Sequence, residues 1–254
     1  MASVKKMTDS GVGPQIKHVS RESENNSNKD INKAYSHLNY SLTPERPIIY
    51  DEEAKCHRRM THYEYYKKRK NELYCYHRAD VKTMAGWVIT APHDLPKDKE
   101  QSFFASSYRF LRDLYGEENI IACYVHYDEG KRKRIVSWNG PVLDENGREK
   151  TRLVCGRPHM HFCFIPVVPD KRHKQGYKIC ANDLLNRAHL QRFHADLEKH
   201  LRADGIYCSV RSGITKTNGR NYTVAEMKAK YEKTGELMYS RNLSRDYSLD
   251  MYLD

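Results

Sequence analysis

The stretch RPHMHFCFIP, residues 157–166, decides the fold, because it places two imidazoles two positions apart in an otherwise apolar run. On a β-strand, residues i and i+2 point to the same face. We therefore expect a strand on which His159 and His161 share one face, while Met160, Phe162 and Phe164 face the opposite way into a core. Two imidazoles side by side can bind one metal ion, although paired histidines on an exposed sheet face are also common.

The hydrophobic pattern around this stretch predicts both strands and helices. Residues 1–36 are polar and rich in Ser, Asn and Lys, a composition typical of a flexible arm. Further strands are expected at residues 37–42, 84–90, 119–126 and 206–210, and helices at residues 51–71, 99–115, 183–203 and 223–231. This order predicts an α+β fold: an antiparallel sheet of about five strands, with helices packed on one face and the other face free for a ligand.

The overall charge favours a polyanionic partner. The chain has 254 residues, with 44 Lys and Arg against 33 Asp and Glu, which gives a formal net charge of +11. Such a balance is typical of proteins that bind nucleic acids. No stretch is apolar enough to span a membrane, and no signal peptide is recognisable at the N-terminus, so we expect a soluble protein of the cytoplasm.

The cysteines fit neither a disulfide framework nor a zinc ribbon. There are 7 of them, an odd number, and none forms a CxxC pair. A reducing cytoplasm is the simplest location for such a chain. One alternative stays open, in which Cys56 and His57 join Cys75 and His77 in a zinc cluster, although their spacing matches no common zinc finger.

A third histidine follows from the strand order. The strand at residues 119–126 ends at His126, and an antiparallel neighbour carrying His159 and His161 would bring three imidazoles to one point. Three nitrogen ligands suit Mn²⁺ or Zn²⁺ and leave coordination positions open for a substrate, as in catalytic sites. Glu129 follows His126 closely and is a candidate to orient a histidine or to join the metal ligands.

The pattern His126-x-x-Glu129 followed by Pro-His159-Met-His161 resembles the MobV (Mob/Pre) plasmid relaxases, a branch of the HUH endonucleases. The resemblance extends to the family's first motif and to the end of its catalytic domain, and covers residues 17–228. The matching segments are Lys17-His18-x-x-Arg21, SNKDIN at residues 27–32, SHLNY at residues 36–40 and TVAEMK at residues 223–228.

The resemblance implies an HUH relaxase-like fold and a metal-dependent enzyme that nicks and rejoins one strand of plasmid DNA at an origin of transfer. The intermediate is a covalent protein–5′-phosphate link, and the nucleophile maps to His18, with Lys17 and Arg21 near the phosphate. Tyrosine is the alternative nucleophile, because most HUH enzymes use one; the candidates are Tyr40, Tyr63 and Tyr66. The implied cofactor is a divalent ion, Mn²⁺ first, with Mg²⁺ or Zn²⁺ as alternatives.

The implied partner is plasmid DNA, as a hairpin next to a single-stranded nick region. Basic residues expected to contact it are Lys67, Lys68, Arg69, Lys131, Arg132, Lys133 and Arg134. The last four lie in residues 130–157, where family members have only a few residues, so we expect a hairpin insertion there. The expected catalytic domain is residues 1–235, followed by a polar tail at residues 236–254.

Two other functions remain open at this point. The chain could be a degenerate relaxase, a non-catalytic module that recognises the origin without cutting it. It could also be an RNA-binding or structural zinc protein, because charge and paired histidines alone do not separate these classes.

Overall fold

The structure, a computed structural model, describes residues 2–21, 30–138 and 140–210. The chain divides into two compact units after Ser212, and the described residues all belong to the first unit. The expected helix at residues 223–231 and the tail from residue 236 lie outside them. The strands are β1 (Ala2–Thr8), β2 (Tyr40–Ser41), β3 (Ile48–Asp51), β4 (Cys56–Arg59), β5 (Lys82–Thr90), β6 (Ile120–His126), β7 (Gly130–Arg134), β8 (Val136–Ser137), β9 (Gly140–Pro141), β10 (Thr151–Cys155), β11 (His159–Phe164), β12 (Val167–Pro169) and β13 (Tyr177–Ile179). The α-helices are α1 (Asp9–Ser20), α2 (His62–Asn71), α3 (Glu100–Tyr115), α4 (Ala181–Leu184) and α5 (Arg187–Ala203), and short 3₁₀ turns are η1 (Lys33–Leu38), η2 (Lys97–Lys99) and η3 (Glu117–Asn119).

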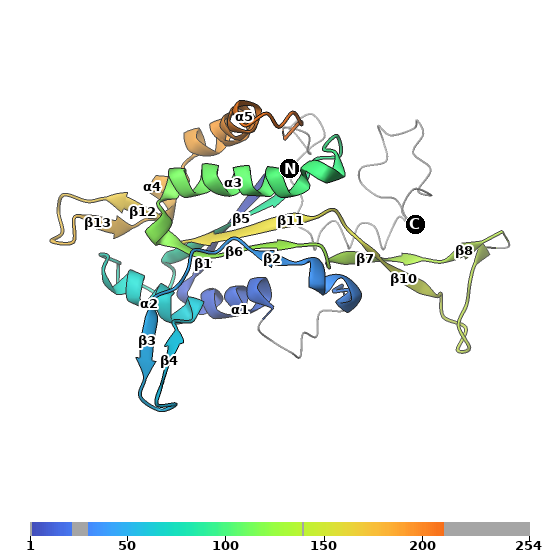
Figure 1. The fold of residues 1–254 in the computed structure, drawn as a ribbon, viewed down its shortest axis with the longest axis horizontal. Coiled ribbons are helices and arrows are strands. Elements are labelled where there is room, and N and C mark those ends of the chain that lie inside the picture. The colour runs from blue at the N-terminus through green and yellow to red at the C-terminus, as the bar shows by residue number, and fades with distance from the viewer. Residues whose placement is uncertain (1, 22–29, 139, 211–254) are drawn as a thin grey trace. The chain divides into compact units, whose positions relative to one another are not determined.

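A five-stranded sheet in the order β1-β5-β11-β6-β2 forms the centre of the molecule (Figure 1). Every neighbouring pair in it is antiparallel. β11 lies between β5 and β6 and is almost completely buried, as expected for the central strand of the sheet. The expected α+β class with a five-stranded antiparallel sheet is confirmed.

Helices cover both faces of this sheet, whereas the sequence predicts them on one face only. On one face, Met160, Phe162 and Phe164 of β11 pack with buried residues of α3 and α5. On the other, Cys163 packs with Val12 and Ile16 of α1 and with Tyr66 of α2. The single-face expectation is therefore corrected. His159 and His161 point to the α1 face, opposite Met160 and Phe162, as the strand period requires.

Three expected elements differ from those observed. Most of the segment expected to be a flexible arm forms β1 and α1, which bury Met7, Val12 and Ile16. Residues 51–71, expected as one helix, are instead the end of the β3–β4 hairpin followed by α2, because Thr61 and Glu64 form a capping box that starts the helix there. The expected strand at residues 206–210 is not a strand.

Residues 130–155 form an arm that continues from the ends of β6 and β11 (Figure 1). β7 pairs with β10 along its whole length, from Gly130 opposite Cys155 to Arg134 opposite Thr151. Trp138 lies near its tip and is fully exposed, at 101%. Because the two strands of the arm leave and return side by side, the arm keeps the ends of β6 and β11 adjacent.

Within the part of the chain that is described, no helix combines the length and the apolar character that crossing a membrane requires.

Candidate metal centre and active site

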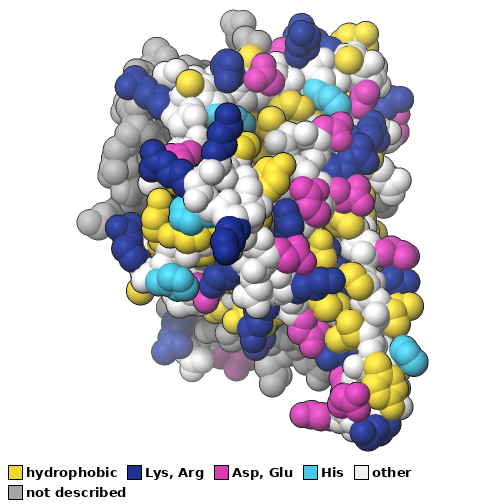
Figure 2. All heavy atoms as spheres, turned by 90° about the vertical axis from the view of Figure 1, so that its left-hand side faces the viewer, with side chains coloured by type: hydrophobic (Ala, Val, Ile, Leu, Met, Phe, Trp, Pro, Cys, Tyr) yellow, Lys and Arg dark blue, Asp and Glu magenta, His cyan; other side chains and the backbone are white. Residues whose placement is uncertain are grey.

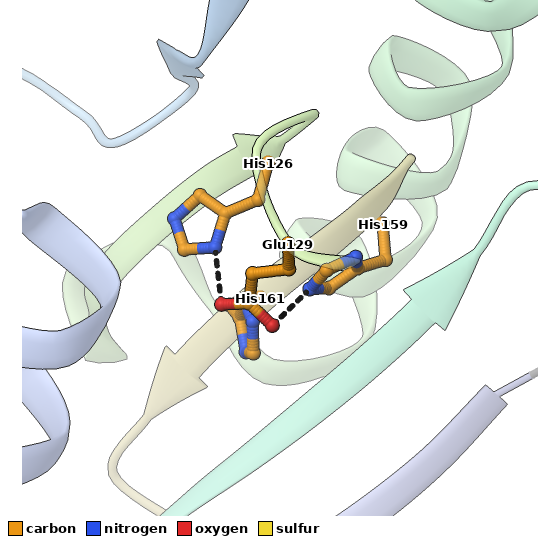
Figure 3. A group of neighbouring side chains, drawn as sticks. All are labelled: His126, Glu129, His159 and His161. Atoms are coloured by element: carbon orange, nitrogen blue, oxygen red, sulfur yellow. Dashed lines mark ion pairs between the residues drawn. The ribbon is translucent and has the colours of Figure 1, made fainter. Parts of the chain in front are cut away.

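Four side chains with metal-binding atoms gather at one end of the central sheet (Figure 3). His126 ends β6 and lies directly opposite His159, the first residue of β11, while His161 follows two positions along. Glu129 comes from the turn after β6 and lies between the three rings. Their ligand atoms all lie within 4.8 Å of one another. The structure thus brings together the three histidines and the glutamate that the sequence singles out.

Backbone carbonyl groups set the tautomers of two of these histidines. His126 Nε2 lies 2.8 Å from the carbonyl oxygen of Val19, and His159 Nδ1 lies 3.3 Å from that of Arg157. Each of these nitrogens donates its N–H to the carbonyl, so the other ring nitrogen faces the cluster. These inward-facing nitrogens are His126 Nδ1 and His159 Nε2, which lie 3.4 Å and 3.2 Å from the carboxylate oxygens of Glu129, and His126 Nδ1 also lies 3.1 Å from the Arg21 guanidinium. A carbonyl that fixes the far nitrogen of a histidine is the usual support for a metal ligand.

His161 contributes an unpaired buried nitrogen. Its Nε2 is buried and has no hydrogen-bond partner among the described residues. Burial, together with His159 and His126 nearby, holds the pKa of His161 well below its usual value, so its ring is neutral at pH 7. A buried polar nitrogen without a partner costs about 1–3 kcal/mol. The orphaned atom, the inward-facing nitrogens of His126 and His159 and the carboxylate fit a bound cation.

Glu129 carries the negative charge of this cluster. Burial would raise its pKa, but hydrogen bonds with His126 and His159, together with Arg21, hold the pKa of Glu129 well below its usual range. It is therefore ionised at neutral pH. Three imidazoles and one carboxylate form a donor set suited to a divalent transition metal.

His18 lies beside this cluster at the C-terminal end of α1. Its Nε2 is 3.4 Å from Glu129 Oε1, and its ring centroid is 5.5 Å from that of His161. Burial lowers the pKa of His18; Glu129 opposes this shift and Arg21 adds to it, with a net decrease. The ring is consequently neutral near pH 7, with a free lone pair.

Arg21 is held by two carboxylates rather than left free. Its guanidinium donates to Asp128 Oδ1 and Glu129 Oε1, at 2.8 Å each, and to the carbonyl oxygen of His18 at 2.7 Å. The Asp128 side chain is fully buried and also accepts from Ser36 at 2.9 Å. Arg21 therefore ties the end of α1, and with it His18, to the turn that carries Glu129.

Sequence reasoning missed Asp128. It lies inside the His-x-x-Glu motif, next to Glu129. An acidic residue at this position was the available signal, because a partly buried arginine such as Arg21 needs an acidic partner.

The tyrosines considered as nucleophiles lie away from the cluster. Tyr40 pairs with Val125 in the sheet and packs on the α3 face, opposite the histidines. Tyr66 is buried and its hydroxyl is hydrogen-bonded to Thr83, at the far end of β5 from the Thr90–His159 pair, about 23 Å away at 3.3 Å per residue. Tyr63, one turn from Tyr66, stacks on its ring at the same end. None of the three reaches the cluster of His126, Glu129, His159 and His161, here called the metal-type cluster.

The basic residues expected to bind DNA fall into three places. Lys17 is exposed on α1, next to His18. Lys67, Lys68 and Arg69 lie on α2, where Arg69 donates to Asn119 at the opposite end of β6 from His126, roughly 20 Å away. The run Lys131–Arg134 lies on β7 in the arm. The end of the molecule that includes β12 and β13 mixes basic and acidic side chains (Figure 2), without a large patch of one sign.

The alternative zinc cluster does not form. Cys56 is exposed on β4, and in the described residues the metal-type cluster contains neither Cys56, His57, Cys75 nor His77.

Comparisons with known proteins agree with this site. The sequence profile of the Mob_Pre family, described as plasmid recombination enzyme, matches residues 1–229. A plasmid recombination enzyme of Streptococcus agalactiae is 26% identical over 233 residues, covering 90% of this chain and 38% of that protein. One of Lactiplantibacillus plantarum is 27% identical over 227 residues, covering 88% of this chain and 50% of that protein. The chain thus spans half or less of the length of these curated relatives.

Solved structures give the same result. A manganese-bound crystal structure of the MobM relaxase domain with plasmid pMV158 oriT DNA matches with a TM-score of 0.62 and 26% identity, covering 91% of this chain and 97% of that chain. A second such structure, at lower pH, matches with a TM-score of 0.60 and 25% identity, covering 90% of this chain and 98% of that chain. With the profile matching nearly the whole sequence and the fold shared with a relaxase domain, this chain belongs to the Mob/Pre family of plasmid recombination enzymes.

Proposed function

We propose that this chain nicks and rejoins one strand of plasmid DNA at an origin of transfer, as the relaxase domain of a plasmid mobilisation and recombination protein. Family membership and the likeness to MobM, crystallised with oriT DNA, support this activity. The expected partner is the same kind of DNA, a hairpin with an adjacent single-stranded nick region, in the bacterial cytoplasm where plasmids reside. The catalytic domain is proposed to extend over residues 1–235, with residues 130–157 as an insertion and residues 236–254 as a polar tail.

One observation carries the proposal: the buried, unpartnered Nε2 of His161 lies next to the inward-facing nitrogens of His126 and His159. We propose that these histidines hold a divalent ion with Glu129 as a further ligand or orienting group. Mn²⁺ is the first choice, since the MobM structures are manganese-bound. A divalent cation offsets the negative charge on the non-bridging oxygens of a phosphodiester and holds the scissile phosphate in line.

His18 is the proposed nucleophile. It is the residue of the first motif that lies beside the cluster, and its neutral ring has a lone pair available. In the proposed step a His18 nitrogen forms a bond to phosphorus, the bond from phosphorus to the 3′ oxygen breaks, and that oxygen leaves with the bonding electrons and takes a proton from solvent. The product is a covalent 5′-phosphohistidine and a free 3′ hydroxyl, and the reverse attack rejoins the strand.

Arg21 acts as a positioning residue in this proposal. Its donors are engaged by Asp128, Glu129 and the His18 carbonyl, so it holds the nucleophile against the metal ligands. A direct contact with the phosphate is not needed for this role.

The activity is tested with a supercoiled plasmid that carries the gene and its upstream DNA. Mn²⁺ should convert the plasmid to nicked circles, and EDTA should prevent this. The double variant H159A/H161A should lose nicking yet retain most DNA binding, because phosphate contacts are made elsewhere. DNA binding without any Mn²⁺-dependent nicking of this plasmid would instead favour the second candidate, a non-catalytic module that recognises the origin.

The nucleophile is tested by trapping the adduct with a single-stranded oligonucleotide from the nick region and mapping it by mass spectrometry. The DNA phosphate should be attached to the peptide that contains His18, and H18A should abolish the adduct. An adduct that survives H18A and maps to Tyr40 or Tyr66 would refute this assignment.

A further inference from the structure

The arm formed by β7 and β10 has two chemically different faces. In the paired register, Lys131 lies opposite Val154 and Lys133 opposite Arg152, while Arg132 lies opposite Leu153 and Arg134 opposite Thr151. Residues directly opposite each other, and residues two apart on one strand, share a face. Lys131, Lys133 and Arg152 therefore lie on one face, here called the lysine face, and Arg132 and Arg134 on the other.

Within the described part of the chain, the lysine face has no compensating acid. Among the described residues, no carboxylate forms an ion pair with Lys131, Lys133 or Arg152, whereas Arg134 on the other face pairs with Glu149 at 2.8 Å. Lys133 and Arg152 are direct cross-strand neighbours of the same charge, an arrangement that destabilises a sheet. A destabilising pair of cations on an exposed face is relieved by a polyanion.

The lysine face continues from the metal-type cluster. Glu129 is extended, because it forms an antiparallel bridge with Ile31 and its carbonyl oxygen accepts from Gly156 N–H. Glu129, Lys131 and Lys133 therefore follow one another at every second position on the same side of the strand. DNA held at Glu129 and the three histidines would meet these lysines next.

The chemistry of this face fits a DNA backbone more closely than unstacked bases. Sites for single strands combine positive charge with aromatic side chains on which bases stack. The paired residues of the lysine face contribute two lysines, an arginine and a valine, with no aromatic side chain. A two-stranded β-ribbon also fits the major groove of duplex DNA, about 12 Å wide.

We propose that the lysine face of the arm binds the phosphate backbone of duplex DNA adjacent to the nick site. The location rests on the proposed function, but duplex binding itself is measured without cleavage. The basic run at residues 131–134 is thereby divided between the two faces. Lys131 and Lys133 contact DNA together with Arg152 of β10, while Arg132 and Arg134 do not.

The test is fluorescence anisotropy with a labelled 20-base-pair duplex of mixed sequence, in EDTA, over a range of salt concentrations. K131Q/K133Q should lower the slope of log K against log salt by about 1.8, since each phosphate contact contributes about 0.9. At 0.1 M salt this corresponds to at most a roughly 60-fold loss of affinity. The matched control R132Q/R134Q removes the same charge from the same strand on the other face and should lose less than about threefold.

Two further readouts make the outcome decisive. R152Q should weaken duplex binding without lowering the thermal midpoint, because it removes a like-charge neighbour of Lys133. The loss caused by K131Q/K133Q should be larger for the duplex than for the single strand of the same sequence. Equal losses of duplex affinity in K131Q/K133Q and R132Q/R134Q would overturn the inference. An equal loss of affinity for single-stranded and duplex DNA in K131Q/K133Q would also overturn it. Absence of nicking with these duplex results intact would refute the proposed function alone.

Discussion

The ion pair between Arg21 and Asp128 is predicted to hold the site together, and its removal is expected to cost much of the fold's stability. The Asp128 side chain is fully buried and that of Arg21 is 16% exposed. D128N keeps the shape of the side chain but removes its charge. Breaking a buried pair from one side costs about 3–5 kcal/mol. Because Glu129 still accepts from Arg21 at 2.8 Å, we expect the lower end of this range, about 3 kcal/mol.

For a chain of this size, that loss lowers the thermal midpoint by about 6–12 °C, at 2–4 °C per kcal/mol. The measurement is urea unfolding followed by circular dichroism, with a thermal melt as a second readout. D80N is the matched control, since the Arg78–Asp80 pair is exposed and should contribute about 0–1 kcal/mol. In a double-mutant cycle, R21Q/D128N should be less unstable than the sum of the single variants. Equal effects of D128N and D80N, or strict additivity with R21Q, would refute this reasoning.

Four other changes have expected outcomes. G130A should lower both the thermal midpoint and the metal affinity, because its Cβ would lie 2.4 Å from the backbone carbonyl oxygen of Val154; an unchanged melt would contradict this close packing. G11A in α1, whose Cβ would meet only the Met7 side chain at an ordinary 3.7 Å, should instead raise stability by up to about 1 kcal/mol in the same melt. Burial would raise the pKa of Asp9, but hydrogen bonds from Lys70 and Tyr66 lower it. The contribution of Asp9 to folding stability is therefore present above its unfolded-state pKa and lost as the pH falls through its folded-state pKa. The stability difference between wild type and D9N should be constant above pH 5 and shrink below about pH 4, and a difference that grows in acid would contradict this sign. Replacing residues 131–154 with a two-residue turn should leave metal affinity within about threefold, and lost metal binding would show that the arm supports the site.

The sequence allowed much of the sheet and the metal-type cluster to be predicted, because both depend on simple periodicities. β11 alternates His159, Met160, His161 and Phe162 with period two, and β5 and β6 are continuous apolar runs. The pairing of His126 with His159 followed from antiparallel neighbours. The family resemblance was needed to draw attention to His18, which composition alone had assigned to an arm.

Other features depended on tertiary contacts that local sequence does not show. α1 contains Gly11, Gly13 and Pro14, all unfavourable for helices, and forms because Val12, Ile16 and Val19 are buried against the sheet. Its hydrophobic spacing of four and three residues was visible but weak beside the polar composition. The second helical layer was missed for the same reason, since α1 and α2 cover the face expected to be free.

The start of α2, by contrast, was predictable from the local sequence. Thr61 and Glu64 form the capping box S/T-x-x-E, which marks a helix start inside the segment expected to be one long helix. The arm's division into a lysine face and an arginine face required the register of β7 against β10, since a shift of one residue would exchange the two sets.

Metal binding by the isolated chain tests the central claim most directly, because it needs no knowledge of the origin sequence. Metal-free protein is titrated with Mn²⁺ by calorimetry, with the free ion followed by electron paramagnetic resonance. We expect saturation at one ion per chain, loss of this binding in H159A/H161A, and no change in the control H57A, whose histidine is exposed on β4 outside the cluster. Binding that is equally strong in H159A/H161A, or no saturable binding in the wild-type chain, would contradict the assignment of this cluster as the metal centre.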